Sequence, residues 1–369
     1  MKFKKLSINN FRGVKKLEID GLKNVNIILG KNNSSKTSIL EAIFLLVGSL
    51  NPEILLRINQ FRKLSFNEQD DFRLVFNNLK FDENIIIEGN QDADTHKILE
   101  IRPTSQNKNF TQNKKTINAE DLKELDFDSH PDDLSINQLT FLSKYKEKHS
   151  KEKTVESKLL FRNGQFNSEI GNIRTALSER AVFLTQSLDM SVNLEKELED
   201  LIVSKQIDLV IEALNIVDEN IKDITFGRNR LIYIDVGMTR MIPINLMGDG
   251  VRRMLVVILS IYNAKGGIVV IDEIENGIYF STLNKLWRSI LVTANKCNTQ
   301  VFITTHNYET IKSLKECLSN LDSSFDDTNL FKENIKVFTI RKLNDGNHKS
   351  YPFNYSELEN AINEDLELR

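Results

Sequence analysis

Long hydrophobic runs are absent from this chain of 369 residues. Its longest apolar stretches, near residues 42–47 and 254–261, are much shorter than the roughly 20 residues of a membrane-spanning helix. The polar N-terminus, Met1-Lys2-Phe3-Lys4-Lys5, also lacks the apolar core of a signal peptide. These absences predict a soluble, untargeted protein of the cytoplasm.

Cysteine is scarce, and neither sign of charge dominates. Cys297 and Cys317 show no metal-binding spacing, and an extracellular disulfide scaffold would need more cysteines, so a reducing cytosol is expected. The chain has 49 basic and 52 acidic residues, so no overall field attracts nucleic acid, and any such contact must be a local patch. No sustained heptad run is present, which excludes long coiled-coil arms.

The sequence does contain a phosphate-binding pattern near its N-terminus. An apolar run of strand length, residues 25–29, is followed by a small polar loop and then by an amphipathic helix from Lys36. Such a unit aims backbone N–H groups and the positive end of a helix dipole at one point, which suits a phosphate chain. The residues expected to hold the phosphates are Gly30, Asn32, Asn33, Ser34, Ser35, Lys36, Thr37 and Ser38.

Two of these residues have predicted chemical roles. Lys36 would reach the β- and γ-phosphates of ATP, and Thr37 would bind Mg²⁺. The pattern G-x-x-x-x-G-K-[ST] has glycine where this chain has Ser35. Because serine disfavours the positive φ open to glycine, we expect a strained loop or reduced affinity. The alternative is an ordinary strand-to-helix turn.

A pair of acids follows a second apolar strand. Residues 268–271 form this strand, and Asp272 and Glu273 lie at its C-terminal end, where ligands bind in open α/β sheets. Asp272 would hold Mg²⁺ through water, and Glu273 would position or deprotonate the attacking water. An ordinary polar turn is the alternative for Asp-Glu alone.

Two further motifs are candidates for contact with the γ-phosphate. Gly248-Asp249-Gly250 begins a predicted helix and offers a second anion-binding N-terminus, although glycine-led helix starts are frequent. His306 ends a strand at the same edge of the sheet and could sense the γ-phosphate through a hydrogen bond. A lone histidine at a strand end is more often structural.

Taken in order, the chain predicts an α/β fold. The expected strands of the first half, including a small antiparallel sheet, are residues 3–8, 16–19, 25–29, 72–76, 85–88 and 97–101. Residues 103–158 are predicted to be an insertion with mobile parts, and Asn163-Gly164 predicts a hairpin over residues 159–166. Helices are expected at residues 195–203 and 207–217.

The last third alternates strands with helices, which predicts a largely parallel sheet covered on both faces. Its expected strands are residues 231–236, 267–271 and 300–304, and its expected helices are residues 251–262, 280–294 and 308–314. A hairpin of residues 335–341 and 349–353 and a helix over residues 356–362 close the chain.

The order of these motifs resembles the ABC-type ATPase head of RecF, the SMC proteins and the OLD family. The resemblance rests on the phosphate loop, Gly248 to Arg253, Ile271 to Gly277, Thr304 to Asn307, and the opening Ile8 to Gly13. The chain is most similar to small bacterial OLD-like ATPases, many of them classed as AAA proteins and found in anti-phage defence systems.

The resemblance implies a P-loop NTPase of the ABC-head type, with a mixed sheet flanked by helices, an antiparallel β lobe and a helical insertion. Residues 1–102 would form the N-terminal half of the head, residues 103–230 the insertion, and residues 231–369 the C-terminal half. ATP and Mg²⁺ are the implied cofactors. Family heads also carry a glutamine that follows Mg²⁺, and Gln60 is the candidate here.

The same resemblance implies an ATP-dependent homodimer. Gly248 and Gly250 of one subunit would cap the γ-phosphate held by Lys36 of the other, with residues 275–277 near the dimer seam. The protein would hydrolyse ATP as a sensor or regulator of a separate effector, plausibly a Toprim-type nuclease, because the roughly sixty residues after His306 are too few for another α/β domain. Two alternatives stay open: a non-hydrolysing nucleotide-dependent scaffold, and a RecF-like DNA repair and maintenance ATPase with a DNA contact sensitive to salt.

Overall fold

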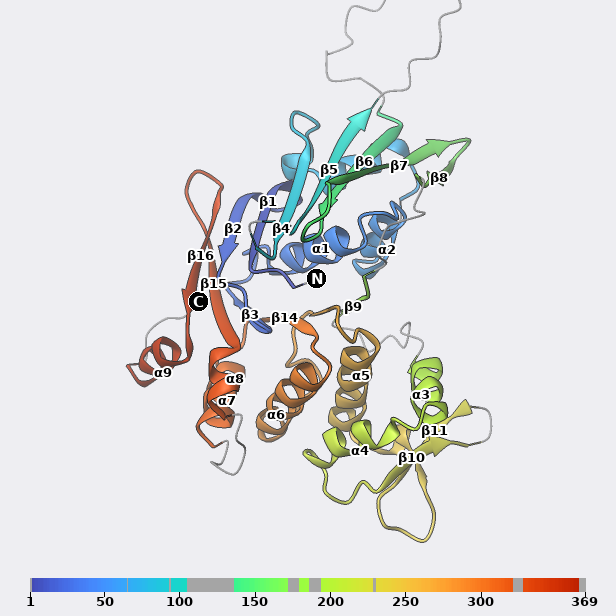
Figure 1. The fold of residues 1–369 in the computed structure, drawn as a ribbon, viewed down its shortest axis with the longest axis vertical. Helices are drawn as coiled ribbons and strands as arrows, with labels where there is room; N and C mark the ends of the chain where they lie inside the picture. Colours follow the sequence, from blue (N-terminus) through green and yellow to red (C-terminus); the bar gives the residue numbers. More distant parts are fainter. Residues whose placement is uncertain are drawn as a thin grey trace, which may run out of the picture.

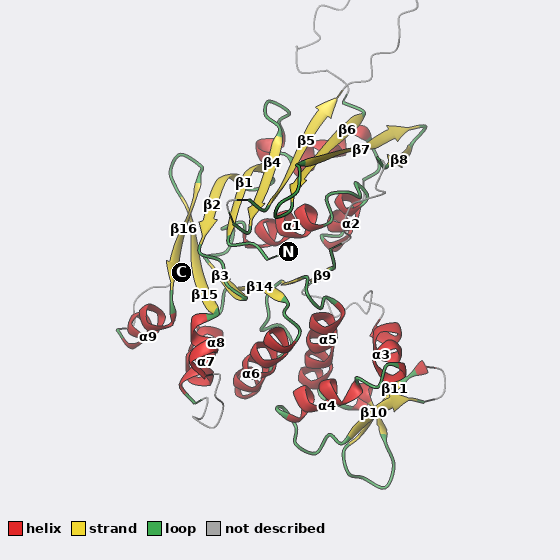
Figure 2. Cartoon of the chain, viewed as in Figure 1, coloured by secondary structure: helices red, strands yellow, loops and turns green. Residues whose placement is uncertain are grey.

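Two β-sheets enclose helix α1 (Lys36–Val47), as Figures 1 and 2 show. The computed structural model describes residues 2–64, 66–92, 94–104, 136–171, 179–185, 194–227, 230–320 and 328–364. This arrangement confirms the predicted α/β class, with a mixed sheet flanked by helices and an antiparallel β lobe beside it.

The core sheet has six strands, of which five run parallel. In spatial order these are β16 (His348–Phe353), β15 (Ile335–Lys342), β3 (Val25–Leu29), β14 (Gln300–Thr305), β13 (Ile268–Ile271) and β9 (Ala181–Leu184), with β16 antiparallel to β15. Every residue of β3, β13 and β14 is buried, which is why these strands are mainly apolar in sequence.

The two faces of this sheet belong to different hydrophobic cores, because successive side chains of a strand point to opposite faces. Val269 and Ile303 face a core formed with helices α5 (Asp249–Asn263), α6 (Phe280–Lys296) and α7 (Tyr308–Ser319). The neighbouring residues of the same strands pack against α1 and the β lobe. Helix α1 is therefore fixed between the core sheet and the lobe.

The β lobe is a seven-stranded antiparallel sheet. Its spatial order is β2 (Val14–Asp20), β1 (Lys5–Phe11), β4 (Ile85–Asn90), β5 (His96–Thr104), β6 (Gln138–Lys146), β7 (Lys153–Arg162) and β8 (Gln165–Glu169). The predicted hairpin between β7 and β8 is confirmed, since Asn163 (φ 53°) and Gly164 (φ 75°) have the paired positive φ values of a tight hairpin turn.

The prediction of a loose insertion over residues 103–158 is wrong where the structure describes this stretch. Strands β6 and β7 extend the lobe, because Leu139 and Phe141 are fully buried and β6 pairs along its whole length with β5. The expected boundary after residue 102 falls inside β5. Residues 105–135 of the expected insertion lie outside the described residues.

The strand predicted at residues 72–76 is also wrong, since Gln69–Val75 is a 3₁₀ helix. Glu68 and Asp71 form a reciprocal capping box at its start. Phe72 and Val75 are three residues apart and both fully buried, which matches the period of a 3₁₀ helix better than the alternation of a strand.

The helical part after the lobe carries its own small sheet. Helices α3 (Leu194–Val203) and α4 (Ile207–Asn215) pack on α5, as their predicted apolar spacing requires. The predicted strand at 231–236 is β11 (Ile232–Asp235), but it pairs antiparallel with β10 (Asp223–Phe226) and β12 (Ile242–Pro243) rather than joining the parallel sheet. The short strand β9, which the sequence pattern did not predict, holds that edge position instead.

The remaining elements complete the C-terminal side. Helix α8 (Thr328–Glu333) precedes the predicted hairpin of β15 and β16, and α9 (Tyr355–Asn363) follows it. Asn354 caps α9, because its side chain accepts a hydrogen bond from the backbone N–H of Glu357.

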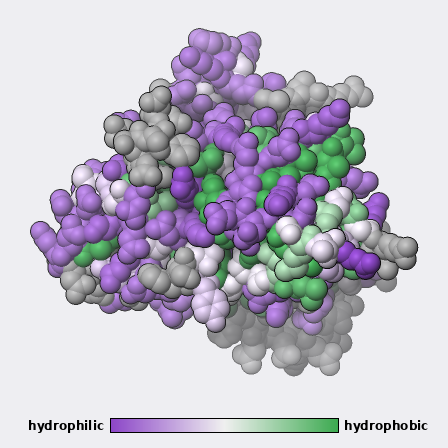
Figure 3. Space-filling view, turned by 90° about the horizontal axis from the view of Figure 1, so that it is seen from below, coloured by the Kyte–Doolittle hydropathy of each residue, from purple (hydrophilic) through white to green (hydrophobic). Residues whose placement is uncertain are grey.

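One face of the molecule is largely polar. Seen from below the view of Figure 1, the face is mainly hydrophilic and is broken by separate hydrophobic areas (Figure 3). Among the described helices, none has both the length and the apolar character needed to cross a membrane.

A buried ion-pair network joins the lobe to α1. Glu41, on α1, is 1% exposed, and its carboxylate lies 2.9 Å from the Nε of Arg12 and 2.6 Å from the Nε of Arg62. Arg12 also donates to Asn59 of α2 (Ile54–Phe61), and Arg62 donates to Ser38 at 3.2 Å. Burial lowers the pKa of Arg12 to about 10, and the Glu41 charge opposes that shift. Two guanidinium groups therefore depend on one buried carboxylate.

We predict that Glu41→Gln lowers the free energy of unfolding by about 3 kcal/mol, because it leaves the buried Arg12 charge without an anionic partner. Urea denaturation monitored by circular dichroism measures this change. The matched control is Glu18→Gln, which removes an exposed carboxylate beside Lys5 and should change stability by less than about 1 kcal/mol. Equal effects of the two substitutions would contradict a structural role for the network.

Candidate functional site

The phosphate loop connects β3 to α1 and has two strained residues. Ser35, the N-cap of α1, has φ 62° and ψ 23°, and Asn33 has φ 66°. The positive φ at Ser35 is the conformation that glycine would adopt without strain, so the expected strain at this departure from the pattern is present. Gly30 is required where it lies, because a Cβ atom there would come within 2.8 Å of the Ile340 carbonyl oxygen.

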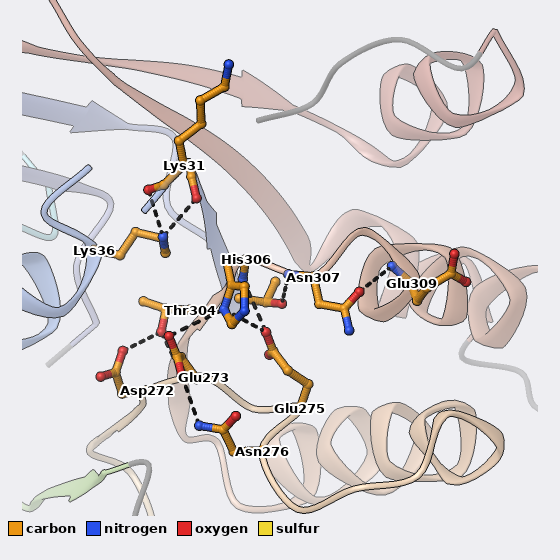
Figure 4. A network of polar contacts seen from close by, with 12 residues as sticks. Lys31, Lys36, Asp272, Glu273, Glu275, Asn276, Thr304, His306, Asn307 and Glu309 are labelled. Carbon is orange, nitrogen blue, oxygen red and sulfur yellow. Dashed lines mark hydrogen bonds and ion pairs between the residues drawn. The ribbon is translucent and has the colours of Figure 1, made fainter. Parts of the chain in front are cut away.

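Lys36 is folded back on this loop. Its Nζ donates to the carbonyl oxygens of Gly30 at 2.8 Å and Lys31 at 3.1 Å (Figure 4). The residue is 8% exposed, and burial lowers its pKa, while Glu273 and Asp272 oppose that shift. The ammonium group is therefore held at the mouth of the loop by weak neutral acceptors, which an anion could replace.

Thr37 and Asp272 meet at the neighbouring point of the sheet edge. The Thr37 hydroxyl donates to Asp272, at 3.0 Å from Oδ2 and 3.2 Å from Oδ1. Thr304, at the end of β14, donates to Asp272 Oδ1 at 2.6 Å. Asp272 is 5% exposed, and burial raises its pKa although both hydroxyl groups oppose the shift. This carboxylate thus joins α1, β13 and β14.

The oxygen atoms of Thr37 and Asp272 fit a Mg²⁺ ion. Mg²⁺ prefers oxygen ligands at about 2.1 Å in octahedral geometry, which places neighbouring ligands about 3 Å apart. Among the described residues no group of three or more His, Cys, Asp and Glu side chains could hold a metal. A Mg²⁺ ion held by one or two protein oxygens and by phosphates suits this donor set.

Glu273 follows Asp272 and adopts a strained backbone conformation, with φ 48°. Its backbone N–H donates to the Thr304 hydroxyl at 2.9 Å, and its carboxylate accepts from Asn276 at 3.0 Å. Arg253 of α5, which is 3% exposed, donates to the Glu273 carbonyl oxygen at 3.2 Å. These contacts hold the carboxylate at the edge of the loop that carries Lys36.

His306 lies between two carboxylates. Its Nδ1 is 3.3 Å from Glu273 Oε1 and 3.3 Å from Glu275 Oε1, and its backbone N–H donates to Glu275 at 3.2 Å (Figure 4). The imidazole is 41% exposed, so one side of the ring meets the solvent. Glu275, which the resemblance assigned to the region of the dimer seam, is turned toward His306 within the same subunit.

A cavity of about 760 Å³ collects the predicted loop residues. Its lining comprises Asn32, Asn33, Ser34, Ser35, Lys36, Thr37, Ser38 and Glu273 from the predicted set, and Arg12, Gly13, Arg62, Leu64, Leu74, Phe76, Asn78 and Leu79 from the lobe and its connections. A smaller neighbouring cavity contains Thr37 and Asp272 together with Glu41 and Arg62. The lining offers cationic groups for phosphates and apolar side chains for an aromatic base.

The structure does not place every predicted residue at this cavity. Gly248, Asp249 and Gly250 line a separate cavity of about 1010 Å³ with Gly277 and Tyr279. A Cβ atom at either glycine would meet no heavy atom within 4 Å, so the packing of this chain does not require glycine there.

Gln60 lines neither of the two cavities that contain Thr37. It is exposed on α2, whose buried face carries Leu55, Ile58 and Asn59. Arg62, two residues later, lines both cavities. The buried face of α2 packs against the protein, and Gln60 lies on the opposite face, which is exposed to solvent.

Four residues of the site were not predicted in these roles: Thr304, Arg253, Arg62 and Glu41. Thr304 belongs to the sequence motif Thr304 to Asn307. Its hydrogen bonds to Asp272 and to the backbone of Glu273 form only because β14 pairs with β13. Arg253 follows the Gly248 motif in sequence. For Arg62 and Glu41, no local pattern distinguishes them from exposed charged residues.

Comparison with known proteins gives a family and one relative of similar length. Residues 1–311 match the family described as AAA ATPase domain (AAA_15). The "ATP/GTP phosphatase" of Helicobacter pylori is 27% identical over an alignment of 363 positions, and the alignment covers 91% of this chain and 91% of that protein. The DNA replication and repair protein RecF of Lactobacillus acidophilus is 54% identical over 41 residues, which is 11% of each chain.

Among solved structures, the SMC head bound to the C-winged helix domain of ScpA covers 98% of this chain and 100% of its own, with a TM-score of 0.49 and 12% identity. At this TM-score the similarity carries no inference about the present chain.

Proposed function

The chain belongs to the AAA ATPase domain family, and on that premise we propose that it binds ATP with Mg²⁺ and hydrolyses it in the cavity of Lys36. The observation that carries the proposal is the meeting of Lys36, Thr37, Asp272 and Glu273 at one sheet edge. Phosphoryl transfer to water requires a phosphate-binding loop, an acid that binds Mg²⁺ and a residue that positions the attacking water, and these residues could supply all three.

Each residue has a distinct task in this proposal. Lys36 leaves the carbonyl oxygens of its loop and binds the β- and γ-phosphates. Thr37 and Asp272 hold Mg²⁺, which neutralises charge on the phosphates. Glu273 orients the attacking water and accepts its proton, while Asn276 and Arg253 keep the glutamate in place.

His306 has a sensing role in the proposal. Its ring lies beside Glu273, which orients the attacking water in this proposal. A hydrogen bond from His306 to the γ-phosphate would therefore form next to that water. Release of the γ-phosphate would remove that hydrogen bond. A movement of His306 on release of the γ-phosphate would then change the contacts of Glu275, which touches both the ring and the backbone N–H of His306.

We also propose that ATP joins two copies of the chain head to tail. Gly248 and Gly250 of one copy would cap the γ-phosphate bound to Lys36 of the other. The open space around both glycines supports this arrangement, because glycine permits close approach of an external group. Two exposed side chains offer apolar area for this contact. Tyr279 is 86% exposed and lines the same cavity as the glycines, and Leu246 is 73% exposed and lies two residues before Gly248.

For the wider role, we propose that the ATP-driven dimer regulates a separate effector in anti-phage defence. The motif order that resembles OLD-like ATPases supports this role. The short RecF match covers only 11% of this chain, and DNA repair is the less favoured alternative, because the balanced charge shows no overall attraction to DNA.

We predict that Lys36→Ala weakens ATP binding by about 10- to 150-fold, the effect of losing one hydrogen bond to a charged group. Glu273→Gln should keep ATP affinity and lower turnover by about 10²- to 10⁴-fold, since the amide cannot accept the proton. Calorimetry and phosphate release measure the two quantities.

The controls for these variants are Lys23→Ala and Glu309→Gln, which change exposed side chains away from the cavity. Normal hydrolysis by Glu273→Gln would refute the role of Glu273. Binding without hydrolysis in the unaltered protein would instead favour the nucleotide-dependent scaffold.

We predict that the Glu273→Gln protein doubles its mass in light scattering when ATP and Mg²⁺ are added, because two shared nucleotides join the copies. Adding Gly250→Arg should prevent this change by filling the γ-phosphate position, and it should leave the fold intact because the site is open. Gln165→Arg, an exposed position on β8, is the matched control for added charge. Assembly that survives Gly250→Arg would exclude the head-to-tail model.

We predict that the purified protein does not cleave DNA. Within the described residues no cluster of His, Cys, Asp and Glu is suited to a metal-dependent nuclease centre. The test incubates plasmid with protein, ATP and Mg²⁺ or Mn²⁺. Nicking that co-purifies with the protein and disappears with a point change in this chain would show that no separate nuclease is needed.

A further inference from the structure

Another cavity, distinct from those described above, lies at the opposite end of α1 from the phosphate loop. It has a volume of about 500 Å³ and is formed by the lobe and by the segments that lead into β9 and β13. Leu50 and the residues Gln91, Asp92, Thr95, Lys97, Tyr145, Lys146, Glu147 and Lys148 line it from one side, and Glu179, Arg180, Lys265, Gly266 and Gly267 line it from the other. Helix α1 has 12 residues and is about 18 Å long, so the cavity is well separated from Lys36.

Positive charge exceeds negative charge in this lining, with five basic and three acidic residues. Lys148 and Lys265 are exposed, and neither side-chain ammonium makes a hydrogen bond or ion pair within the described part of the chain. One of the acids is already engaged, because the Asp92 carboxylate accepts from the backbone N–H groups of Asp94 at 2.9 Å and Thr95 at 2.8 Å. The cavity is therefore suited to an anion.

Lys97 supplies a buried cation at the wall of this cavity. It is 4% exposed, and its Nζ donates to the Val47 carbonyl oxygen at 2.7 Å and to Glu179 at 2.9 Å. An ammonium group has three N–H donors, so these two contacts leave one donor for a ligand. Glu179 already pairs the charge of Lys97, so the remaining N–H offers a hydrogen bond to an acceptor oxygen of a ligand.

The size and the remaining lining define the class of ligand. A volume of 500 Å³ lies within the range of small-molecule sites, and the Tyr145 side chain adds an aromatic surface to the cationic groups. Lysine ammonium groups are point-charge partners for phosphate. We propose that this cavity is a second anion-binding site, which takes a phosphorylated small molecule of about the size of a mononucleotide.

The position of the site connects it to the phosphate-loop helix. Val47 is the last residue of α1 and Lys36 is the first, so Lys97 contacts the carbonyl end of the helix whose other end carries the loop. A ligand that draws the Lys97 ammonium into the cavity would weaken its hydrogen bond to Val47. The proposal does not depend on ATP hydrolysis at the Lys36 cavity.

The experiment is lysine acylation of the full-length protein with an N-hydroxysuccinimide ester, read residue by residue by mass spectrometry. Adenosine monophosphate and inorganic pyrophosphate are the probes. We expect either probe at saturation to slow acylation of Lys148 and Lys265 by about threefold or more, because a bound phosphate blocks the ammonium groups. Lys4 and Lys23, exposed and outside the cavity, should react at an unchanged rate. Since each lysine is read separately, failure of the ATP site does not affect the result.

A second measurement tests affinity in a Lys36→Ala background, which weakens binding at the Lys36 cavity so that the second site dominates the signal. Lys148→Glu with Lys265→Glu should weaken adenosine monophosphate binding in calorimetry by about tenfold or more. Lys4→Glu with Lys23→Glu makes the same change in net charge and should leave that affinity unchanged. Equal protection of all four lysines, or no protection of Lys148 and Lys265 by either probe, would overturn the proposal.

Discussion

The buried carboxylate of Asp272 is the interaction on which the site depends. A carboxylate in the interior is stable only when it is hydrogen-bonded or paired, and the hydroxyl groups of Thr37 and Thr304 meet that need. Thr37 belongs to α1, Asp272 directly follows β13 and Thr304 belongs to β14, and these segments are far apart in sequence. Their contact brings the phosphate loop, Glu273 and His306 to one sheet edge, so losing the hydroxyl partners would disturb all three together.

Two residues at this edge of the sheet have strained backbone conformations. Ser35 and Glu273 both have positive φ, a conformation that costs a residue with a side chain about 1–2 kcal/mol. Such strain persists only where the surrounding structure fixes the backbone. At Glu273 the fixing contacts are Thr304 at the N–H and Arg253 at the carbonyl oxygen. In the catalytic proposal, the fixed backbone of Glu273 therefore sets the direction in which its carboxylate points, toward the phosphate loop.

Helix α1 connects the separate parts of the molecule. Its first turn carries Lys36 and Thr37, its middle carries Glu41 with the two arginines of the lobe side, and its end accepts the Lys97 hydrogen bond. A rigid helix transmits a displacement at one end to the other, since its backbone hydrogen bonds resist bending. The lobe therefore contacts the nucleotide-binding element directly, and ligands at either end of α1 would act on the same rigid body.

The sequence alone determined the local units of the site: the phosphate loop, the acids after β13 and the histidine after β14. These signals are local, and the carboxyl ends of neighbouring parallel strands meet at one edge, so the residues could be expected to lie together. Tertiary structure decided which strands pair. It put β9 rather than β11 in the parallel sheet, added β6 and β7 to the lobe, turned residues 69–75 into a 3₁₀ helix, and brought Arg62 rather than Gln60 to the cavity. The physical reason is that an apolar pattern specifies which face of an element is buried, whereas the partner of that face is set by contacts between distant segments, which no local spacing records.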